Sequence, residues 1–360
     1  MMGGQELFGG PAYGLDRAAK GAALAAVLQE LTEHHARNCE PYRNILQAYG
    51  PRPTGGVEDI PFIPVRLFKQ LDLRSIPQES VFKTLTSSGT TGQTPSRIYL
   101  DAETAGAQSR ALAKIVTDFI GPTRLPMLII DHPSTVKDRR TFSARGAGIL
   151  GMMTFGRQHA YALSDETMEL DFDQLDGFAE RHAGQPIVAF GFTFMVWRYF
   201  LQQLERAGRK LPFENGILFH SGGWKKLEDE AVSNERFKEA AAELAGFSRV
   251  HNFYGMVEQV GSVFMECEAG RLHTPAFADL IVRDPLNWAP LAIGQEGIIQ
   301  VLSILPRSYP GHSLLTEDRG VITGEDDCPC GRLGKTFRVQ GRIPMAELRG
   351  CSDTHAAQAS

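Results

Sequence analysis

A stretch rich in glycine and hydroxyl groups, residues 86–97 (TSSGTTGQTPSR), has the composition of a phosphate-binding loop. Glycines let the backbone turn several N–H groups toward one point, and serine and threonine hydroxyls supply further donors. The stretch lies between two β-like runs, residues 81–85 and 98–100. It lacks the Gly-Lys-Ser/Thr ending of a Walker loop. Composition alone therefore leaves two interpretations open, a polyphosphate-binding loop and a plain hairpin connection.

Four residues in the last third of the chain have the side chains of a structural zinc site. Three thiolates and one imidazole complete a tetrahedral zinc coordination sphere. The spacing Cys-x-Cys is not the usual Cys-x-x-Cys knuckle, and the two halves of the set lie far apart in the sequence. Unliganded thiols in turns are therefore the alternative interpretation. The candidate ligands are Cys267, His273, Cys328 and Cys330.

Alternating apolar and amphipathic runs predict the elements that position these groups. Of the 360 residues, 42% are hydrophobic and 22% are charged, which is typical of a globular protein with a sizeable core. Buried strands that alternate with helices indicate an α/β fold with parallel-rich sheets flanked by helices. We predict strands at residues 125–131, 187–191 and 216–220, and helices within 15–50 and at 102–120, 194–207 and 227–245. The shorter β-like runs after residue 260, among them 280–282 and 297–302, predict a small barrel or β subdomain.

Charge and cysteine content exclude several classes of function. The net charge of -5 gives no basic surface for a nucleic-acid backbone, so a nucleic-acid partner is disfavoured. No apolar run is long enough for a membrane span. Five cysteines are too few, and odd in number, for a secreted disulfide framework, and the N-terminus does not read as a signal peptide. We therefore expect a cytoplasmic protein.

Four motifs in a fixed order resemble those of the adenylate-forming superfamily of acyl-CoA synthetases, luciferases and nonribosomal adenylation domains. The first is the hydroxyl- and glycine-rich loop. Residues 252–258 (NFYGMVE) resemble the Tyr-Gly-x-x-Glu motif, with valine where threonine is usual. Residues 316–320 (TEDRG) resemble the motif whose aspartate holds the ribose hydroxyls, and residues 340–342 (QGR) resemble the Gly-Arg hinge. The resemblance implies the fold of that superfamily's main domain.

The resemblance also implies a chemistry with ATP and Mg²⁺. A carboxylate attacks the α-phosphate of ATP and gives an acyl adenylate and pyrophosphate. Glu258 would help to hold Mg²⁺, Asp318 would accept hydrogen bonds from the ribose, and Arg97 would contact phosphate where many family members carry a lysine. The implied nucleotide-binding residues are Ser87, Ser88, Gly89, Thr90, Thr91, Gly92, Gly222, Gly223, Asn252, Tyr254, Gly255, Asp318 and Arg342.

A narrower resemblance, from Ile60 to the C-terminus, is to the LuxE-type acyl-protein synthetases, the ligase subunits of fatty acid reductase complexes. It is carried by segments that include residues 220–225 (HSGGWK), 308–311 (SYPG), 328–332 (CPCGR) and 346–351 (AELRGC). In that family a cysteine near the C-terminus accepts the acyl group as a thioester and delivers it to a reductase subunit. The resemblance assigns this role to Cys351 and implies an acyl reductase as partner.

One departure from the superfamily concerns the cation that assists adenylation. Most members carry it as a lysine on a mobile C-terminal lid, whereas here 18 residues follow Arg342 and none is a lysine. We therefore expect a chain without the lid, in which Arg97, Lys225 or Lys226 supplies the positive charge. The expected regions are a helical segment packed on the main domain (1–50), an α/β nucleotide- and acid-binding region (51–260), a β-rich subdomain (261–342) and a tail that carries Cys351 (343–360).

The sequence does not identify the carboxylic acid substrate. Phe190, Gly191, Phe192 and His251 are candidates for a pocket that would suit an alkyl chain or an aromatic ring. Two further functions stay open. One is an acid ligase that transfers the acyl group to coenzyme A or a carrier protein, and the other is a non-catalytic nucleotide-binding subunit of a reductase complex.

Overall fold

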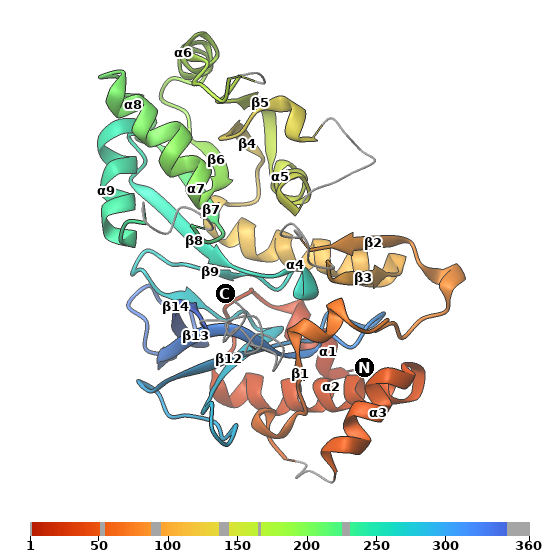
Figure 1. Cartoon of the computed structure of the whole chain (residues 1–360). Helices are drawn as coiled ribbons and strands as arrows, with labels where there is room; N and C mark the ends of the chain where they lie inside the picture. The colour runs from red at the N-terminus through yellow and green to blue at the C-terminus, as the bar shows by residue number, and fades with distance from the viewer. Residues whose placement is uncertain are drawn as a thin grey trace, which may run out of the picture.

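Two six-stranded sheets with helices packed on them form most of the part of the chain that the structure describes (Figure 1). The computed structural model describes residues 2–50, 55–87, 95–136, 144–164, 167–224 and 231–343. None of the helices within these ranges has both the length and the apolar character needed to cross a membrane. The helices are α1 (Met2–Gly9), α2 (Arg17–Asn38), α3 (Glu40–Tyr49), α4 (Ala102–Ile120), α5 (Ala144–Met153), α6 (Phe172–Arg181), α7 (Thr193–Met195), α8 (Gln202–Arg206) and α9 (Asn234–Ala245).

The first sheet has the order β5-β4-β6-β7-β8-β9 and is parallel except for its edge strand β9. Its central strands are apolar runs buried on both faces, the pattern expected of a parallel sheet covered by helices. The predicted strands at 125–131, 187–191 and 216–220 are therefore confirmed. The strands of this sheet are β4 (Leu125–Ile129), β5 (Gly156–Tyr161), β6 (Ile187–Phe192), β7 (Gly216–Ser221), β8 (Arg249–Tyr254) and β9 (Phe264–Met265).

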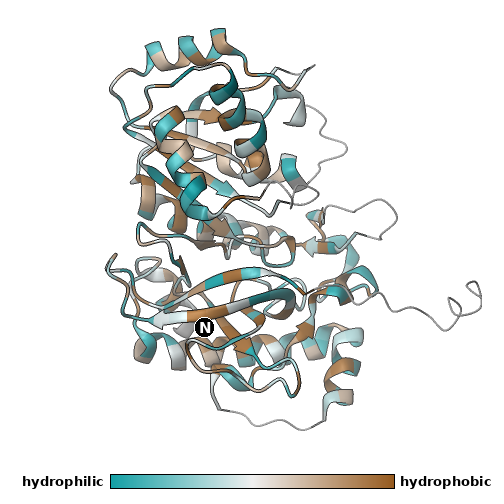
Figure 2. Ribbon diagram, turned by 60° about the vertical axis from the view of Figure 1, so that its left-hand side comes forward, coloured by the Kyte–Doolittle hydropathy of each residue, from teal (hydrophilic) through white to brown (hydrophobic). Residues whose placement is uncertain are grey.

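Alternate residues of the parallel strands bury against different helices. Met127 of β4 lies in the apolar cluster that includes α4 and α5. Its neighbour Leu128 lies in the cluster that includes α6, α8 and α9. This follows from the two-residue period of a strand. The helices that cover the sheet carry both hydrophilic and hydrophobic segments in Figure 2, as amphipathic helices do.

Two of the predicted helices differ from the expected ones in detail. The helix expected over 227–245 begins later, at Asn234, because the Ser233 side chain accepts a hydrogen bond from the Arg236 N–H and caps the helix there. Residues 231–233 are therefore not helical. The helix expected over 194–207 is present as α7, a π-helical turn at Val196–Leu201, and α8. The helix at 102–120 is confirmed as α4, which Asp101 caps.

The second sheet is open rather than a barrel, because its path β10-β14-β13-β12-β11 does not close on itself. Its neighbours on this path pair antiparallel, and β1 pairs parallel with β13. A strand of the 51–260 region therefore belongs to the sheet of the 261–342 region. A separate hairpin is formed by β2 (Lys83–Thr86) and β3 (Arg97–Leu100). The strands of the second sheet are β1 (Ile63–Pro64), β10 (Leu272–His273), β11 (Ala278–Arg283), β12 (Glu296–Ser303), β13 (Ser313–Glu325) and β14 (Lys335–Arg342).

The N-terminal helices lie beside this second sheet (Figure 1). Thr32 of α2 contacts His312 at 3.0 Å, just before β13. Lys20 of α2 lies 3.5 Å from Asp279 of β11, and Lys335 of β14 donates to the other carboxylate oxygen of Asp279 at 3.0 Å. All three side chains are at most 14% exposed. This buried charge cluster fixes α2 to two strands of the sheet.

We expect the Asp279→Asn variant to lose about 3–5 kcal/mol of unfolding free energy, because two buried ammonium groups lose their counter-charge. Burial raises the pKa of Asp279, but Lys20 and Lys335 outweigh it and hold that pKa below its usual value. A carboxyl with a depressed pKa stabilises the fold above its unfolded pKa and loses that effect as the pH falls. Urea unfolding of both proteins should therefore show a difference at neutral pH that shrinks in acid.

The matched control for this measurement is Asp173→Asn, an exposed carboxylate in the first turn of α6. Its expected cost is within about 1 kcal/mol. An equal cost in the two variants would show that the cluster does not stabilise the fold.

Candidate active site

The carboxyl ends of the parallel strands form the edge at which open α/β sheets bind ligands. At this edge β6 ends at Phe192, and Gly222 and Gly223 directly follow β7. Gly222 has φ +87°, and a Cβ placed there would come within 3.3 Å of the Phe192 ring. Only glycine suits this backbone conformation. The two predicted glycines therefore form a turn without side chains beside the end of β6.

Three predicted residues from three separate motifs meet beside this edge. The Tyr254 hydroxyl, at the end of β8, donates a hydrogen bond of 2.6 Å to Asp318 Oδ2 on β13. Arg342 on β14 pairs with Asp318 across the strands, and its Nε lies 3.6 Å from Asp318 Oδ1. Burial, and secondarily the Asp318 charge, raise the pKa of Tyr254, so the phenol keeps its proton and donates. The arrangement joins the first sheet to the second at the predicted ribose-binding aspartate.

The orientation of Asp318 is fixed by its own strand. Its backbone N–H donates to Thr316 Oγ1 at 3.1 Å, and the Thr316 hydroxyl donates to the Ile299 carbonyl at 2.8 Å. The Asp318 side chain keeps 17% of its surface exposed. The carboxylate is therefore held in place and can still accept hydrogen bonds from a ligand.

Glu258 lies in a short 3₁₀ turn (Val257–Gln259) that follows β8, and it is 6% exposed. The Tyr309 hydroxyl donates to the Glu258 carbonyl at 2.9 Å, and Gln108 of α4 donates to Tyr309 at 3.3 Å. A Cβ on Gly311 would come within 2.8 Å of the same carbonyl, so a glycine is required there. Burial raises the pKa of Glu258. A carboxylate in this setting is stabilised by a nearby cation.

The predicted phosphate-binding loop begins and ends on a regular hairpin. Strands β2 and β3 pair antiparallel, which confirms the β-like runs on both sides of the loop. The Ser87 N–H donates to the Ser96 carbonyl at 3.2 Å, and the Ser96 N–H donates to Ser87 Oγ at 2.9 Å. Arg97 begins β3 and is exposed. The predicted residues Ser88, Gly89, Thr90, Thr91, Gly92, Lys225, Lys226 and Cys351 lie outside the described residues.

Three of the four candidates for the acid pocket are enclosed by the core. Phe190 stacks on Phe253 with ring centroids 6.3 Å apart. A Cβ on Gly191 would lie 2.8 Å from Val196 Cγ2, so this glycine permits close packing of β6. Buried His251 has its Nδ1 at 2.9 Å from the Glu266 carbonyl. Of the four, Phe192 alone is partly exposed.

The sequence did not predict a role for Glu266, although this residue fixes the backbone of the predicted nucleotide-binding motif at residues 252–258. Its side chain is 3% exposed, and Oε2 accepts the Asn252 N–H at 3.0 Å. Its Oε1 pairs with Lys238 of α9 at 2.9 Å. An acidic residue inside the apolar run Phe264–Cys267 is the sequence signal that could have identified it.

A second ion pair at the sheet edge was also missed. Asp131 lies two residues after the end of β4, is 1% exposed on its side chain, and accepts a hydrogen bond of 2.7 Å from Arg145 Nε. The second Arg145 hydrogen bond to this carboxylate is 2.5 Å long. The sequence pattern predicts Asp131 only as the last residue of a strand. A carboxylate at the end of a buried apolar run is the sequence signal for such a position.

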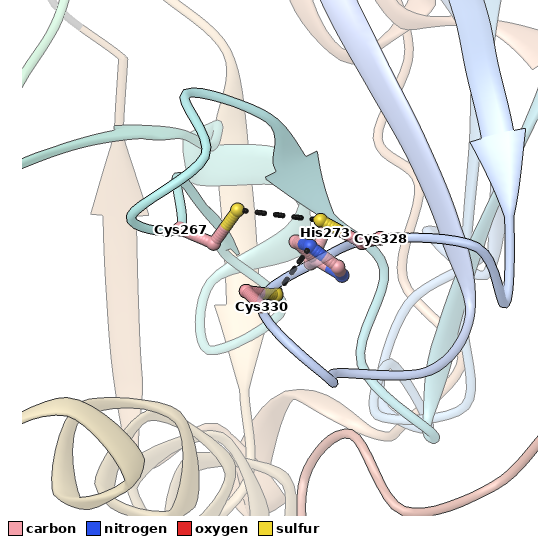
Figure 3. Close-up of side chains that lie close together, drawn as sticks. All are labelled: Cys267, His273, Cys328 and Cys330. Atoms are coloured by element: carbon pink, nitrogen blue, oxygen red, sulfur yellow. Dashed lines mark hydrogen bonds between the residues drawn. The ribbon is translucent and has the colours of Figure 1, made fainter.

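The four predicted zinc ligands meet at one place (Figure 3). Their ligand atoms all lie within 4.8 Å of one another. Burial raises the pKa of Cys267 to about 12 and lowers that of His273 to about 4. The structure therefore brings all four predicted ligands together.

Comparisons with known proteins agree with the fold and the motif order. The chain is 22% identical over 340 residues to the long-chain-fatty-acid–luciferin-component ligase of Vibrio harveyi, covering 89% of this chain and 84% of the relative. The corresponding ligase of Aliivibrio fischeri is 21% identical over 336 residues, with the same coverage. A structure of 2-hydroxyisobutyryl-CoA ligase in the postadenylation state is similar in fold, with a TM-score of 0.69 and 17% identity over 91% of this chain and 69% of that one.

The model of the acyl-protein synthetase family LuxE matches residues 16–359, which is almost the whole chain. The adenylate-forming fold expected from the motifs is thereby confirmed. The chain belongs to the LuxE family of acyl-protein synthetases.

Proposed function

We propose that this ligase forms an acyl adenylate from a carboxylic acid and ATP, and then passes the acyl group through Cys351 to a partner acyl reductase. The observation that carries the proposal is the meeting of Tyr254, Asp318 and Arg342. These residues come from three distant motifs, and the 2.6 Å hydrogen bond and the 3.6 Å ion pair join them next to the ligand-binding edge of the parallel sheet. Their types suit recognition of a nucleotide ribose.

Each group of residues around this edge has its own role in the proposed adenylation. Asp318 accepts hydrogen bonds from the ribose hydroxyls, and Arg342 offers donors beside it. Residues 87–92 and Arg97 contact the phosphates. Mg²⁺, which binds one or two carboxylates together with substrate phosphates, neutralises phosphate charge when bound, and the buried Glu258 carboxylate suits it as a ligand. The acid oxygen attacks the α-phosphorus, and pyrophosphate leaves.

The second half of the proposed reaction uses a thiol nucleophile. The Cys351 thiolate attacks the acyl carbonyl, the bond from that carbon to the phosphate oxygen breaks, and AMP leaves with the electron pair. The product is a thioester on the chain, from which the acyl group passes to the reductase. Two relatives that are named as ligases of long-chain fatty acids favour a fatty acid over an aryl acid as the substrate.

Exchange of label between pyrophosphate and ATP tests the activation step. We expect exchange that depends on added acid and rises with chain length across a panel of fatty acids, with aryl acids weaker. Two controls accompany the measurement. One is the protein with ATP and pyrophosphate but no acid, and the other is the acid panel without the protein. Absence of exchange with every acid, with the reductase present, would favour a non-catalytic nucleotide-binding subunit. Exchange followed by a product on coenzyme A, with no acyl group on the chain, would favour a coenzyme A ligase.

A further inference from the structure

We propose that Cys267, His273, Cys328 and Cys330 bind one structural Zn²⁺ ion that ties the edges of the two sheets together. This site is independent of the proposed acid activation. The four side chains come from two segments and point toward one another in Figure 3. Cys267 lies between β9 and β10, His273 is the last residue of β10, and the other two cysteines belong to the loop between β13 and β14.

Two of the distances between ligand atoms are close to those of a zinc tetrahedron, and all four ligand atoms lie within 4.8 Å of one another. Bonds of about 2.3 Å to sulfur and 2.05 Å to nitrogen, at tetrahedral angles, separate two sulfurs by about 3.8 Å and a sulfur from a nitrogen by about 3.6 Å. The Cys267 and Cys328 sulfurs are 3.7 Å apart, and the Cys330 sulfur is 3.4 Å from His273 Nε2. A disulfide requires two sulfurs about 2.05 Å apart, so Cys267 and Cys328 are free thiols and do not form a disulfide.

Backbone hydrogen bonds turn the chain sharply in both segments that carry the ligands. The Gly270 N–H donates to the Cys267 carbonyl at 2.9 Å, and the Cys267 N–H donates to the Arg271 carbonyl at 2.9 Å, which turns the first segment back toward His273. In the second segment the Gly331 N–H donates to the Cys328 carbonyl at 3.0 Å. Gly331 adopts φ +82°, a conformation that favours glycine. A tight turn thus begins at Cys267 in the first segment and at Cys328 in the second.

A layer of polar contacts supports the cluster from outside. The Arg332 backbone N–H donates to the Cys330 sulfur at 3.5 Å, a contact that stabilises thiolate charge. The Arg332 guanidinium pairs with Asp118 of α4 at 2.8 Å and with Glu268 at 2.6 Å. It also lies 4.1 Å from the centroid of the Phe119 ring. Three thiolates and Zn²⁺ leave a net charge of about -1, and the Arg332 backbone N–H donates toward this charge.

Burial and connectivity define the role of the site. Cys267 and His273 are fully buried and Cys328 is 8% exposed. Four protein ligands fill the tetrahedron and leave no position for a substrate, which is the mark of a structural rather than a catalytic zinc. β9 pairs with β8 in the first sheet, and β10 pairs with β14 in the second. The ion would therefore join the two sheets through the hairpin that also contains Glu266, the acceptor for the Asn252 N–H.

The test is metal analysis of the untagged full chain purified without chelator. We expect about one zinc per chain in the wild type and at least about tenfold less in the Cys330→Ser variant. The matched control is Cys39→Ser, which changes another buried cysteine outside the cluster and should keep its zinc.

Cobalt provides a second readout if Cys330→Ser does not fold. Wild-type protein freed of metal by a chelator is titrated with Co²⁺, and we expect thiolate-to-cobalt charge-transfer bands and the strong visible bands of a tetrahedral site at one equivalent. Less than about 0.1 equivalent of zinc in the wild type, together with absence of these bands, would overturn the proposal. One equivalent of iron in place of zinc, or a Cys267–Cys328 disulfide in peptide maps of the purified chain, would also overturn it.

Discussion

Replacing Cys351 with serine is expected to reduce the acyl-enzyme by more than about 100-fold, while ATP–pyrophosphate exchange stays within about twofold of wild type. Exchange requires only the adenylation half of the reaction, whereas transfer requires a thiolate. A serine hydroxyl stays protonated near neutral pH and attacks poorly without a neighbouring base. The measurement is retention of labelled acyl group on denatured protein, with release by neutral hydroxylamine as the mark of a thioester.

The control for this variant is Cys39→Ser, whose side chain lies in the apolar core and has no part in the proposed transfer. It should acylate as the wild type does. Acyl label that persists in Cys351→Ser would show that another residue accepts the group. Equal loss of exchange and of label in this variant would show that Cys351 acts in adenylation or in folding rather than as the acceptor.

Replacing Glu258 with glutamine is expected to lower the acid-dependent exchange rate by about 10²–10³-fold, because the proposed site would lose its carboxylate ligand for the Mg²⁺ that neutralises phosphate charge. The variant keeps the size of the side chain. The Tyr309 hydrogen bond is to the Glu258 backbone carbonyl, so the variant retains it. The measurement is exchange as a function of Mg²⁺ concentration. A ligand role predicts that the variant needs more Mg²⁺ for half its maximal rate.

The matched control is Glu317→Gln, a carboxylate next to Asp318 that makes an ion pair with Arg66 at the surface. Its exchange rate should stay within about twofold of the wild type, because exposed ion pairs contribute little. If Glu258→Gln exchanges as slowly as predicted but with an unchanged Mg²⁺ requirement, Glu258 is a structural residue and not a ligand.

The central strands of the first sheet could be predicted because their apolar runs are continuous. Strands β5 and β8 could not, for a physical reason. In β5 three consecutive residues, 157–159, are exposed, and β8 begins with an exposed arginine and contains His251 and Asn252. Such strands are defined by the hydrogen bonds of their neighbours rather than by their own hydropathy. The pairing of β1 with β13 likewise joins residues about 250 positions apart, a distance at which local patterns carry no signal.

The candidate site was predicted through motif order rather than through geometry. Tyr254 and Asp318 were both named from the resemblance, but their direct hydrogen bond depends on how the second sheet packs beside the first. The roles of Glu266 and Tyr309 became visible only in the structure, because each acts through backbone groups of another segment. The four-ligand cluster was predictable in part. Its residue types were evident, and the pairing of β10 with β14 brings the two halves together.

The most direct test of acyl transfer to the chain is the intact mass of the protein after incubation with ATP, Mg²⁺ and a fatty acid. We predict a mass increase equal to one fatty acid minus one water, which depends on ATP and maps to the peptide that contains Cys351. An unchanged mass under conditions that support acid-dependent exchange would contradict the central claim that the chain itself carries the acyl group.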